Sequence, residues 1–213
     1  MAVGSAYLFL LGLASGIAFL ALTSYRHVSP RWLKWVLIAS GALLMSRYVM
    51  TAVWPNVGGV VAIFLELWWV IGSVGLTLPG VFAIDQLIRH PAMTPSKLLR
   101  WYALFLLVNG VALIGMALVP KKFWFVFVQL TYIIFLIGLV GVCLLLRRKI
   151  PSRLIQRASL GLALSYGYLG LSILIVTLGL GQGDERVFLY PEMLVLFALW
   201  YAYETSARLQ QSV

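Results

Sequence analysis

Apolar residues run along this chain in long blocks, separated by short polar or basic joints that contain proline or glycine. A membrane-spanning helix needs about 20 mostly apolar residues, and each block is about that long. The blocks lack the apolar–polar alternation of barrel strands. The pattern therefore predicts an all-α fold, a polytopic bundle of seven transmembrane helices. The predicted spans are residues 6–24, 32–53, 59–88, 98–119, 123–146, 154–180 and 188–207.

Composition supports the same fold class. The 213 residues are 62% hydrophobic and only 10% charged, and their mean hydropathy is +1.00. A soluble domain has about 25% charged residues, so these side chains could not cover a soluble surface. We expect one transmembrane domain over residues 1–213, in the cytoplasmic (plasma) membrane. The first block lacks a basic leader and Arg26 follows it, so we expect it to be retained rather than cleaved.

Lysine and arginine are distributed unequally between the two sides of the predicted bundle. Twelve lie on one side, eleven of them in joints and one in the C-terminal tail; three lie on the other side, and Arg47 alone is left within a span. The positive-inside rule assigns the basic side to the cytoplasm, so the N-terminus is outside and the C-terminus is cytoplasmic. This placement explains the net charge of +10 without nucleic acid. The basic joints are expected to meet anionic lipid head groups.

The three cytoplasmic joints resemble one another, each with basic residues around a proline that precedes the next span. Proline suits the first turn of a helix, so shared turn chemistry is one explanation. The other is an internal duplication in which helices 1–3 repeat as helices 5–7, as in some transporters. The sequence leaves both open.

Charge inside a span is the most informative chemical signal, because an ionised Arg there costs about 2.5–3.5 kcal/mol. Arg47 and Glu66 have no charged residue four positions away on their own helices. At about 1.5 Å per residue, Arg47 lies about 10 Å below Trp54, and Glu66 about 12 Å below Gly58. The depths match on neighbouring spans, which predicts an Arg–carboxylate pair.

Other polar and aromatic side chains are predicted at similar depths. Together they suggest a polar crevice that opens to the outside and binds a small molecule or ion. The candidate ligand-binding residues are Arg47, Glu66, Trp69, Asn109, Gln129, Tyr132, Tyr168 and Glu192. The alternative is a structural tie between helices, with the remaining groups bonding from helix to helix.

Glu192 itself has two interpretations. If the last helix begins at Pro191, Glu192 is a first-turn acid favoured by the helix dipole, which is the interpretation the sequence slightly favours. If the helix begins near Asp184, Glu192 lies one to two turns into the membrane and joins the crevice. The other acids have local explanations. Asp85 and Glu204 each precede an arginine by four residues, and Asp184 and Glu185 are expected to cap the last helix.

The sequence offers little support for catalysis or metal binding. A single cysteine, Cys143, excludes an internal disulfide, a CxxC pair and a cysteine metal cluster, and its apolar surroundings indicate a buried residue. His27 and His90 lie in joints without paired carboxylates, so no metal site is expected. We predict no enzyme and no catalytic residue, and the residues indicate no particular cofactor.

Three classes of function remain, in this order. The first is a transporter of a small molecule or ion, or its membrane-embedded binding subunit. The second is a heptahelical sensor, receptor or accessory subunit that acts through a membrane partner or a homo-oligomer. The third is an intramembrane enzyme. The sequence does not name the ligand.

Overall fold

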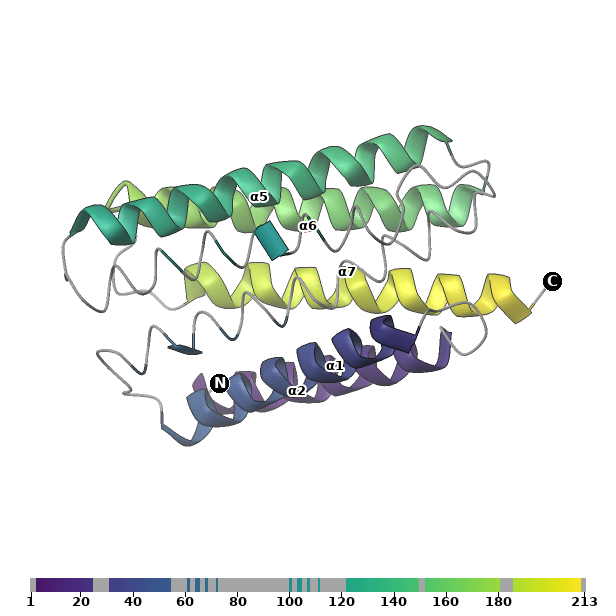
Figure 1. Ribbon diagram of the computed structural model, residues 1–213, viewed down its shortest axis with the longest axis horizontal. Helices are drawn as coiled ribbons and strands as arrows, with labels where there is room; N and C mark the ends of the chain where they lie inside the picture. The colour runs from purple at the N-terminus through teal and green to yellow at the C-terminus, as the bar shows by residue number, and fades with distance from the viewer. Residues whose placement is uncertain are drawn as a thin grey trace. The chain divides into compact units, whose positions relative to one another are not determined.

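Long helices account for nearly all of the described chain in the computed structural model. The structure describes residues 3–24, 31–54, 122–149, 152–180 and 186–211, and single positions at 61, 64, 65, 68, 72, 100, 103, 104, 107 and 111. The long helices in these ranges are α1 (Val3–Ser24), α2 (Arg31–Val53), α5 (Lys122–Lys149), α6 (Arg153–Thr177) and α7 (Arg186–Gln211) (Figure 1). The all-α prediction is confirmed for this part of the chain.

Each of these helices covers one predicted span, and the ends agree to within a few residues. The predicted spans at 59–88 and 98–119 are described only at single positions, and all of those positions are helical. The all-α class is therefore established, while the number of seven transmembrane helices stays a prediction.

The end of α6 differs from the prediction, which continued the span to residue 180. Gly179 has a φ of 82°, a left-handed conformation that glycine adopts without strain. The Leu180 N–H donates to the Ile175 carbonyl and the Gly179 N–H to the Val176 carbonyl. This is the Schellman pattern, in which a glycine just past the helix satisfies the last carbonyls. The helix therefore ends at Thr177.

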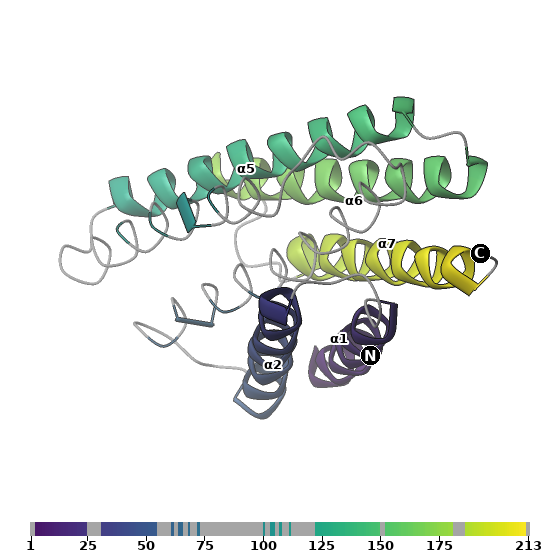
Figure 2. The ribbon, with the colours of Figure 1, turned by 45° about the vertical axis from the view of Figure 1, so that its right-hand side comes forward.

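The chain divides into two compact units, residues Met1–Arg89 with Leu199–Val213, and residues His90–Ala198. In the first unit α1 packs against α2, and in the second α5 packs against α6 (Figures 1 and 2). Helix α7 contributes its first part to the second unit and its last part to the first. The prediction of a single domain stays a prediction.

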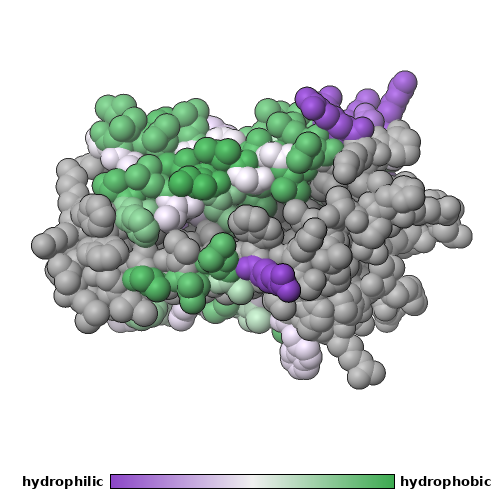
Figure 3. Space-filling model, turned by 45° about the horizontal axis from the view of Figure 1, so that its top comes forward, coloured by the Kyte–Doolittle hydropathy of each residue, from purple (hydrophilic) through white to green (hydrophobic). Residues whose placement is uncertain are grey.

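Two of the described helices are long and apolar enough to cross a membrane. They cover Gly4–Thr23 and Arg153–Thr177, with mean hydropathies of 2.0 and 1.8. Only 33% and 39% of them is buried, whereas a core helix of a soluble protein is mostly buried. Figure 3 shows a broad apolar area over α5 and α6, with hydrophilic residues at one end. These helices therefore present apolar side chains to their surroundings.

Candidate functional site

Arg47 is a buried charged residue on α2, with 5% of its surface exposed. Its guanidinium carbon lies 5.6 Å from the ring centroid of Tyr7 on α1 and 5.3 Å from that of Tyr48. Both distances fall within the range of cation–π attraction, about 6 Å. The two rings are 6.4 Å apart and tilted by 34°. A permanent cation is therefore held against two tyrosine rings inside the first unit.

Small residues bring α1 and α2 close enough for this arrangement. A β-carbon on Gly41 would lie 3.0 Å from Cβ of Ala18, and one on Gly4 would lie 3.7 Å from the Ala52 carbonyl oxygen. The start of α1 therefore lies beside the end of α2, and the helices are antiparallel. This register places Tyr7, near the start of α1, level with the last turns of α2.

One further helical residue, Gly72, approaches α2 close to Arg47. Gly72 is helical and buried, and a β-carbon there would lie 2.9 Å from both Cβ of Leu44 and the carbonyl oxygen of Ser40. Only a residue without a side chain permits this approach, because a backbone carbonyl cannot move away cheaply. Leu44 precedes Arg47 by three residues, so Gly72 packs about one helical turn away from the cation.

Further polar side chains are buried in the same unit. They are Ser40 on α2 and Tyr203 and Thr205 on the last part of α7. None of them was among the predicted site residues. The hydropathy pattern gave no signal for them, because serine, threonine and tyrosine are tolerated throughout such helices.

The remaining predicted site residues are only partly accounted for. Glu66, Trp69 and Asn109 lie outside the described residues, and so does the predicted Arg47–Glu66 pair. Gln129 is half-buried and Tyr132 is buried, three residues apart on one face of α5. These two belong to the second unit, whereas Arg47 belongs to the first.

Tyr168 lies on an exposed face of α6. It is 42% exposed, whereas Tyr166, two residues earlier, is 2% exposed. Tyr166 therefore occupies the buried face that was expected for Tyr168. The sequence did not distinguish the two, because nearly apolar helices show weak amphipathic periodicity.

Glu192 corrects the slightly favoured interpretation of a first-turn acid. Helix α7 begins at Arg186 and contains Pro191 in its interior. Glu192 therefore lies nearly two turns into the helix, and it is only 5% exposed. Proline at position 191 resembled a helix start, but nearly apolar helices tolerate an internal proline when neighbouring groups compensate the lost backbone bond. Glu192 is a buried acid of the second unit.

Several serine and threonine hydroxyls within the helices bond to their own backbone. Ser15, Thr51 and Ser172 each donate to the carbonyl oxygen four residues earlier, at 2.8, 2.9 and 3.0 Å. Ser165 and Thr177 do the same. Such bonds satisfy the hydroxyl without a second helix. The buried Ser172 therefore already has a partner in its own helix.

The expectations for the other charged and metal-binding groups have mixed outcomes. The Glu204–Arg208 pair is confirmed, with 2.6 Å between Oε1 and Nη2. Cys143 is buried, as expected. Asp85, Asp184 and Glu185 lie outside the described residues. Within the described ranges, no group of three or more His, Cys, Asp or Glu side chains could hold a metal ion.

Tyr7 and Tyr48, the two aromatic neighbours of Arg47, were not among the predicted site residues. A signal was present, because α1 ends at Ser24 and α2 begins at Arg31. Counting the same number of residues back from Ser24 and forward from Arg31 places residue 7 level with residue 48.

The chain as a whole matches no protein-family model, no curated protein and no solved structure.

Proposed function

We propose that this chain is an integral membrane protein of seven transmembrane helices, with its N-terminus outside. It binds or transports a small molecule or ion through a polar crevice in the outer half of the bundle. The observation that carries the proposal is Arg47, a buried cation that lies against the neighbouring rings of Tyr7 and Tyr48.

The membrane location rests on the exposed faces of the helices. Ile134 and Ile137 on α5 and Leu164 on α6 are each more than 60% exposed. Burying such side chains in lipid removes them from water at about 25 cal/mol per Å². Trp200 packs on Gly16 of α1, which supports retention of the first helix as part of the fold.

The chemistry of Arg47 favours an anionic group in the ligand. Guanidinium stays charged at any physiological pH and presents five donors in a planar fork that matches a carboxylate or phosphate. Ionisable residues within membrane helices are rare and mark substrate or ion pathways by default. The tyrosine rings reduce the cost of burying the cation, which lets the site keep its charge when no ligand is bound.

Transport assays on reconstituted protein test this function. Candidate anions are first identified by mass spectrometry of small molecules that co-purify with the protein. Their uptake and binding are then compared between wild type, Arg47→Met and Arg47→Lys. The matched control is Leu44→Met, which replaces a side chain by one of similar volume about one turn away on the same helix, at a position that is also buried.

We expect Arg47→Met to remain folded and inserted but to lose binding and uptake, while Leu44→Met retains both. Arg47→Lys should retain part of the binding, because it keeps the charge but loses the fork. Binding without uptake would favour a receptor or accessory subunit over a transporter. Full activity in a folded Arg47→Met protein would leave Arg47 as a purely structural residue.

A further inference from the structure

An apolar groove lies between α5 and α6, within the second unit. Its volume is about 260 Å³, and its lining includes Leu136, Ile137 and Val140 from α5 and Tyr166, Gly167 and Leu171 from α6. Leu136 and Tyr166 are buried and form its floor, whereas Ile137 and Leu171 are more than half exposed and flank it. The groove is therefore open to the surroundings along its length.

Glycine accounts for the hollow. A β-carbon on Gly167 would meet no atom within 4 Å, so the space beside this residue is empty. A β-carbon on Gly170 would lie 3.7 Å from Cδ1 of Leu136, in ordinary contact. At Gly170 the two helices touch, and at Gly167 they leave a gap.

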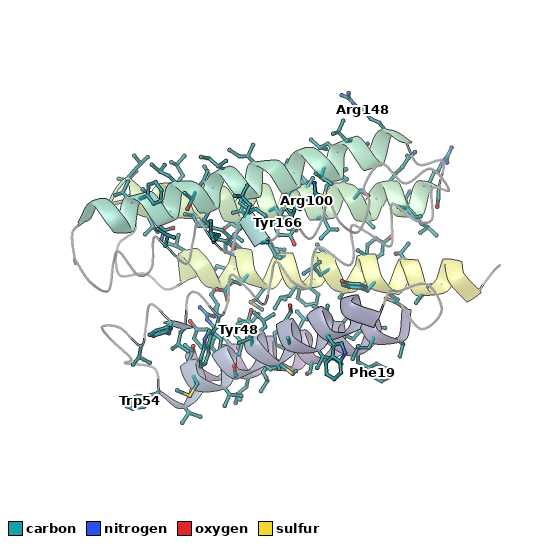
Figure 4. The ribbon with its side chains drawn as sticks, in the orientation of Figure 1. Phe19, Tyr48, Trp54, Arg100, Arg148 and Tyr166 are labelled. Atoms are coloured by element: carbon teal, nitrogen blue, oxygen red, sulfur yellow. The ribbon has the colours of Figure 1, made fainter. Side chains whose placement is uncertain are left out.

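Four exposed arginines stand at one end of the same two helices. They are Arg147, Arg148, Arg153 and Arg157. Figure 4 shows Arg148 projecting from α5 near its end, beyond Tyr166 of α6 along the helix pair. Within the described part of the chain, the structure gives these four arginines no ion pair.

The start of α6 adds to this positive potential. Its first turn contains no acidic residue, and the Ser152 side chain makes no capping hydrogen bond. The N-terminus of a helix carries about half a positive charge, which an acid or a bound anion normally offsets. Here Arg153 and Arg157 add positive charge instead.

The groove and the arginines lie on one continuous face. Arg147 follows Val140 by seven residues, close to two helical turns, so both point to the same side of α5. Arg157 precedes Leu171 by fourteen residues, close to four turns, so the same holds for α6. Gly170 contacts Leu136, which fixes the register of the two helices. Arg147 lies about 16 Å from Leu136 along α5, and Arg157 lies about 20 Å from Gly170 along α6, toward the same end of the helix pair.

We infer that this face binds one anionic phospholipid, with its phosphate at Arg147, Arg153 and Arg157 and an acyl chain in the groove. The inference rests on the membrane location in the proposed function. Val140 lies about 10 Å below Arg147, and Ile133, also in the groove lining, lies about 21 Å below it. One leaflet has about 15 Å of hydrocarbon beneath a head-group layer of about 5–7 Å. The groove therefore spans the depth of one acyl chain.

Charge complementarity selects this occupant over an apolar helix of a partner. A transmembrane helix would fill the groove but would leave the arginines unneutralised. A free phosphate would meet the arginines but would leave the groove empty. Only a lipid with an anionic head group and a long chain satisfies both parts of the face.

Native mass spectrometry of the full chain, delipidated in detergent, tests the inference with dioleoyl phosphatidylglycerol and dioleoyl phosphatidylcholine. We expect one phosphatidylglycerol per chain, retained in preference to phosphatidylcholine. The double variant Arg147→Ala/Arg157→Ala should bind phosphatidylglycerol about twenty-five-fold more weakly, at about fivefold per arginine. Arg208→Ala, a basic residue in the other unit, should bind it as wild type does. Inorganic phosphate should not displace the lipid.

The groove is tested by Gly167→Leu, which fills the empty space and should abolish retention of the lipid. Gly138→Leu is the matched control, since position 138 on α5 is equally open but lies outside the groove lining. Equal retention of the two lipids, or unchanged binding in Gly167→Leu, would overturn the inference. So would a dimer that dissociates in Gly167→Leu, because a second copy would then occupy the groove. Release of the protein from membranes by alkaline carbonate would instead refute the proposed membrane location.

Discussion

Trp200 of α7 packs so closely on Gly16 of α1 that a β-carbon at position 16 would overlap Cζ3 of the indole ring. The first and last helices of the chain are therefore joined through a position that excludes any side chain. Close approach over small residues is a common way for apolar helices to associate without a hydrophobic driving force.

Gly16→Ala should destabilise the protein by about 1–3 kcal/mol, because overpacking forces the indole ring or the helix to move. Gly12→Ala is the matched control. It lies four residues earlier on the same helix and would meet no atom within 4 Å, so it should be neutral or slightly stabilising. Thermal unfolding in detergent measures both. Equal stabilities would show that Trp200 does not lie against Gly16.

The rings around Arg47 lead to a second prediction. Tyr7→Leu should lower the stability by about 1–2 kcal/mol relative to Tyr7→Phe, because leucine has no π face for the guanidinium whereas phenylalanine retains one. Phe19→Leu is the control, an aromatic-to-leucine change on the exposed side of the same helix (Figure 4). A loss of stability in Tyr7→Leu no larger than that in Phe19→Leu would show that the cation–π contact does not stabilise the protein.

The orientation of α5 can be tested directly. This helix has 28 residues and is about 42 Å long, enough to place its two ends on opposite sides of a bilayer. In a Cys143→Ala background, a cysteine at position 122 should react with an impermeant reagent in intact cells, and one at position 148 should not. The opposite pattern would invert the proposed topology. Native Cys143 is buried and should itself react slowly.

The Glu204–Arg208 pair should contribute little despite its short distance. Its side chains are 38% and 75% exposed, and exposed pairs four residues apart on a helix are worth about 0.3–0.5 kcal/mol. Arg208→Ala should therefore change the free energy of unfolding by less than about 0.5 kcal/mol. A loss comparable to that of Gly16→Ala would mean that Arg208 has a further contact.

The sequence was most informative where the signal was local. Long apolar blocks predicted the helices to within a few residues, because hydropathy and breaker residues act on neighbouring positions. The Glu204–Arg208 pair was predicted for the same reason, since residues four apart on a helix face each other. Glu192 shows the limit of local signals, because Pro191 resembled the start of a helix and lies inside one.

Contacts between helices were harder to predict. Arg47 was identified as unusual from its position within a predicted span. Its neighbour Tyr7 lies forty residues earlier, and the depth of a residue does not show which way its side chain faces around the helix axis. The groove beside Gly167 had no sequence signal either, since an almost wholly apolar helix does not reveal which glycine faces a gap. Both required the rotation of paired helices about their axes, which only packing determines.

The hydroxyls that bond to their own backbone have a consequence for biosynthesis. In the proposed membrane location, these bonds leave fewer unsatisfied groups when a helix such as α6 enters a bilayer before its neighbours have been made. Helix α2 is different, because it carries Arg47, which is costly in hydrocarbon without a favourable neighbour. The ribosome makes α1 first, so Tyr7 is already in place when Arg47 emerges. The aromatic ring of Tyr7 is therefore synthesised before the charge that it stabilises.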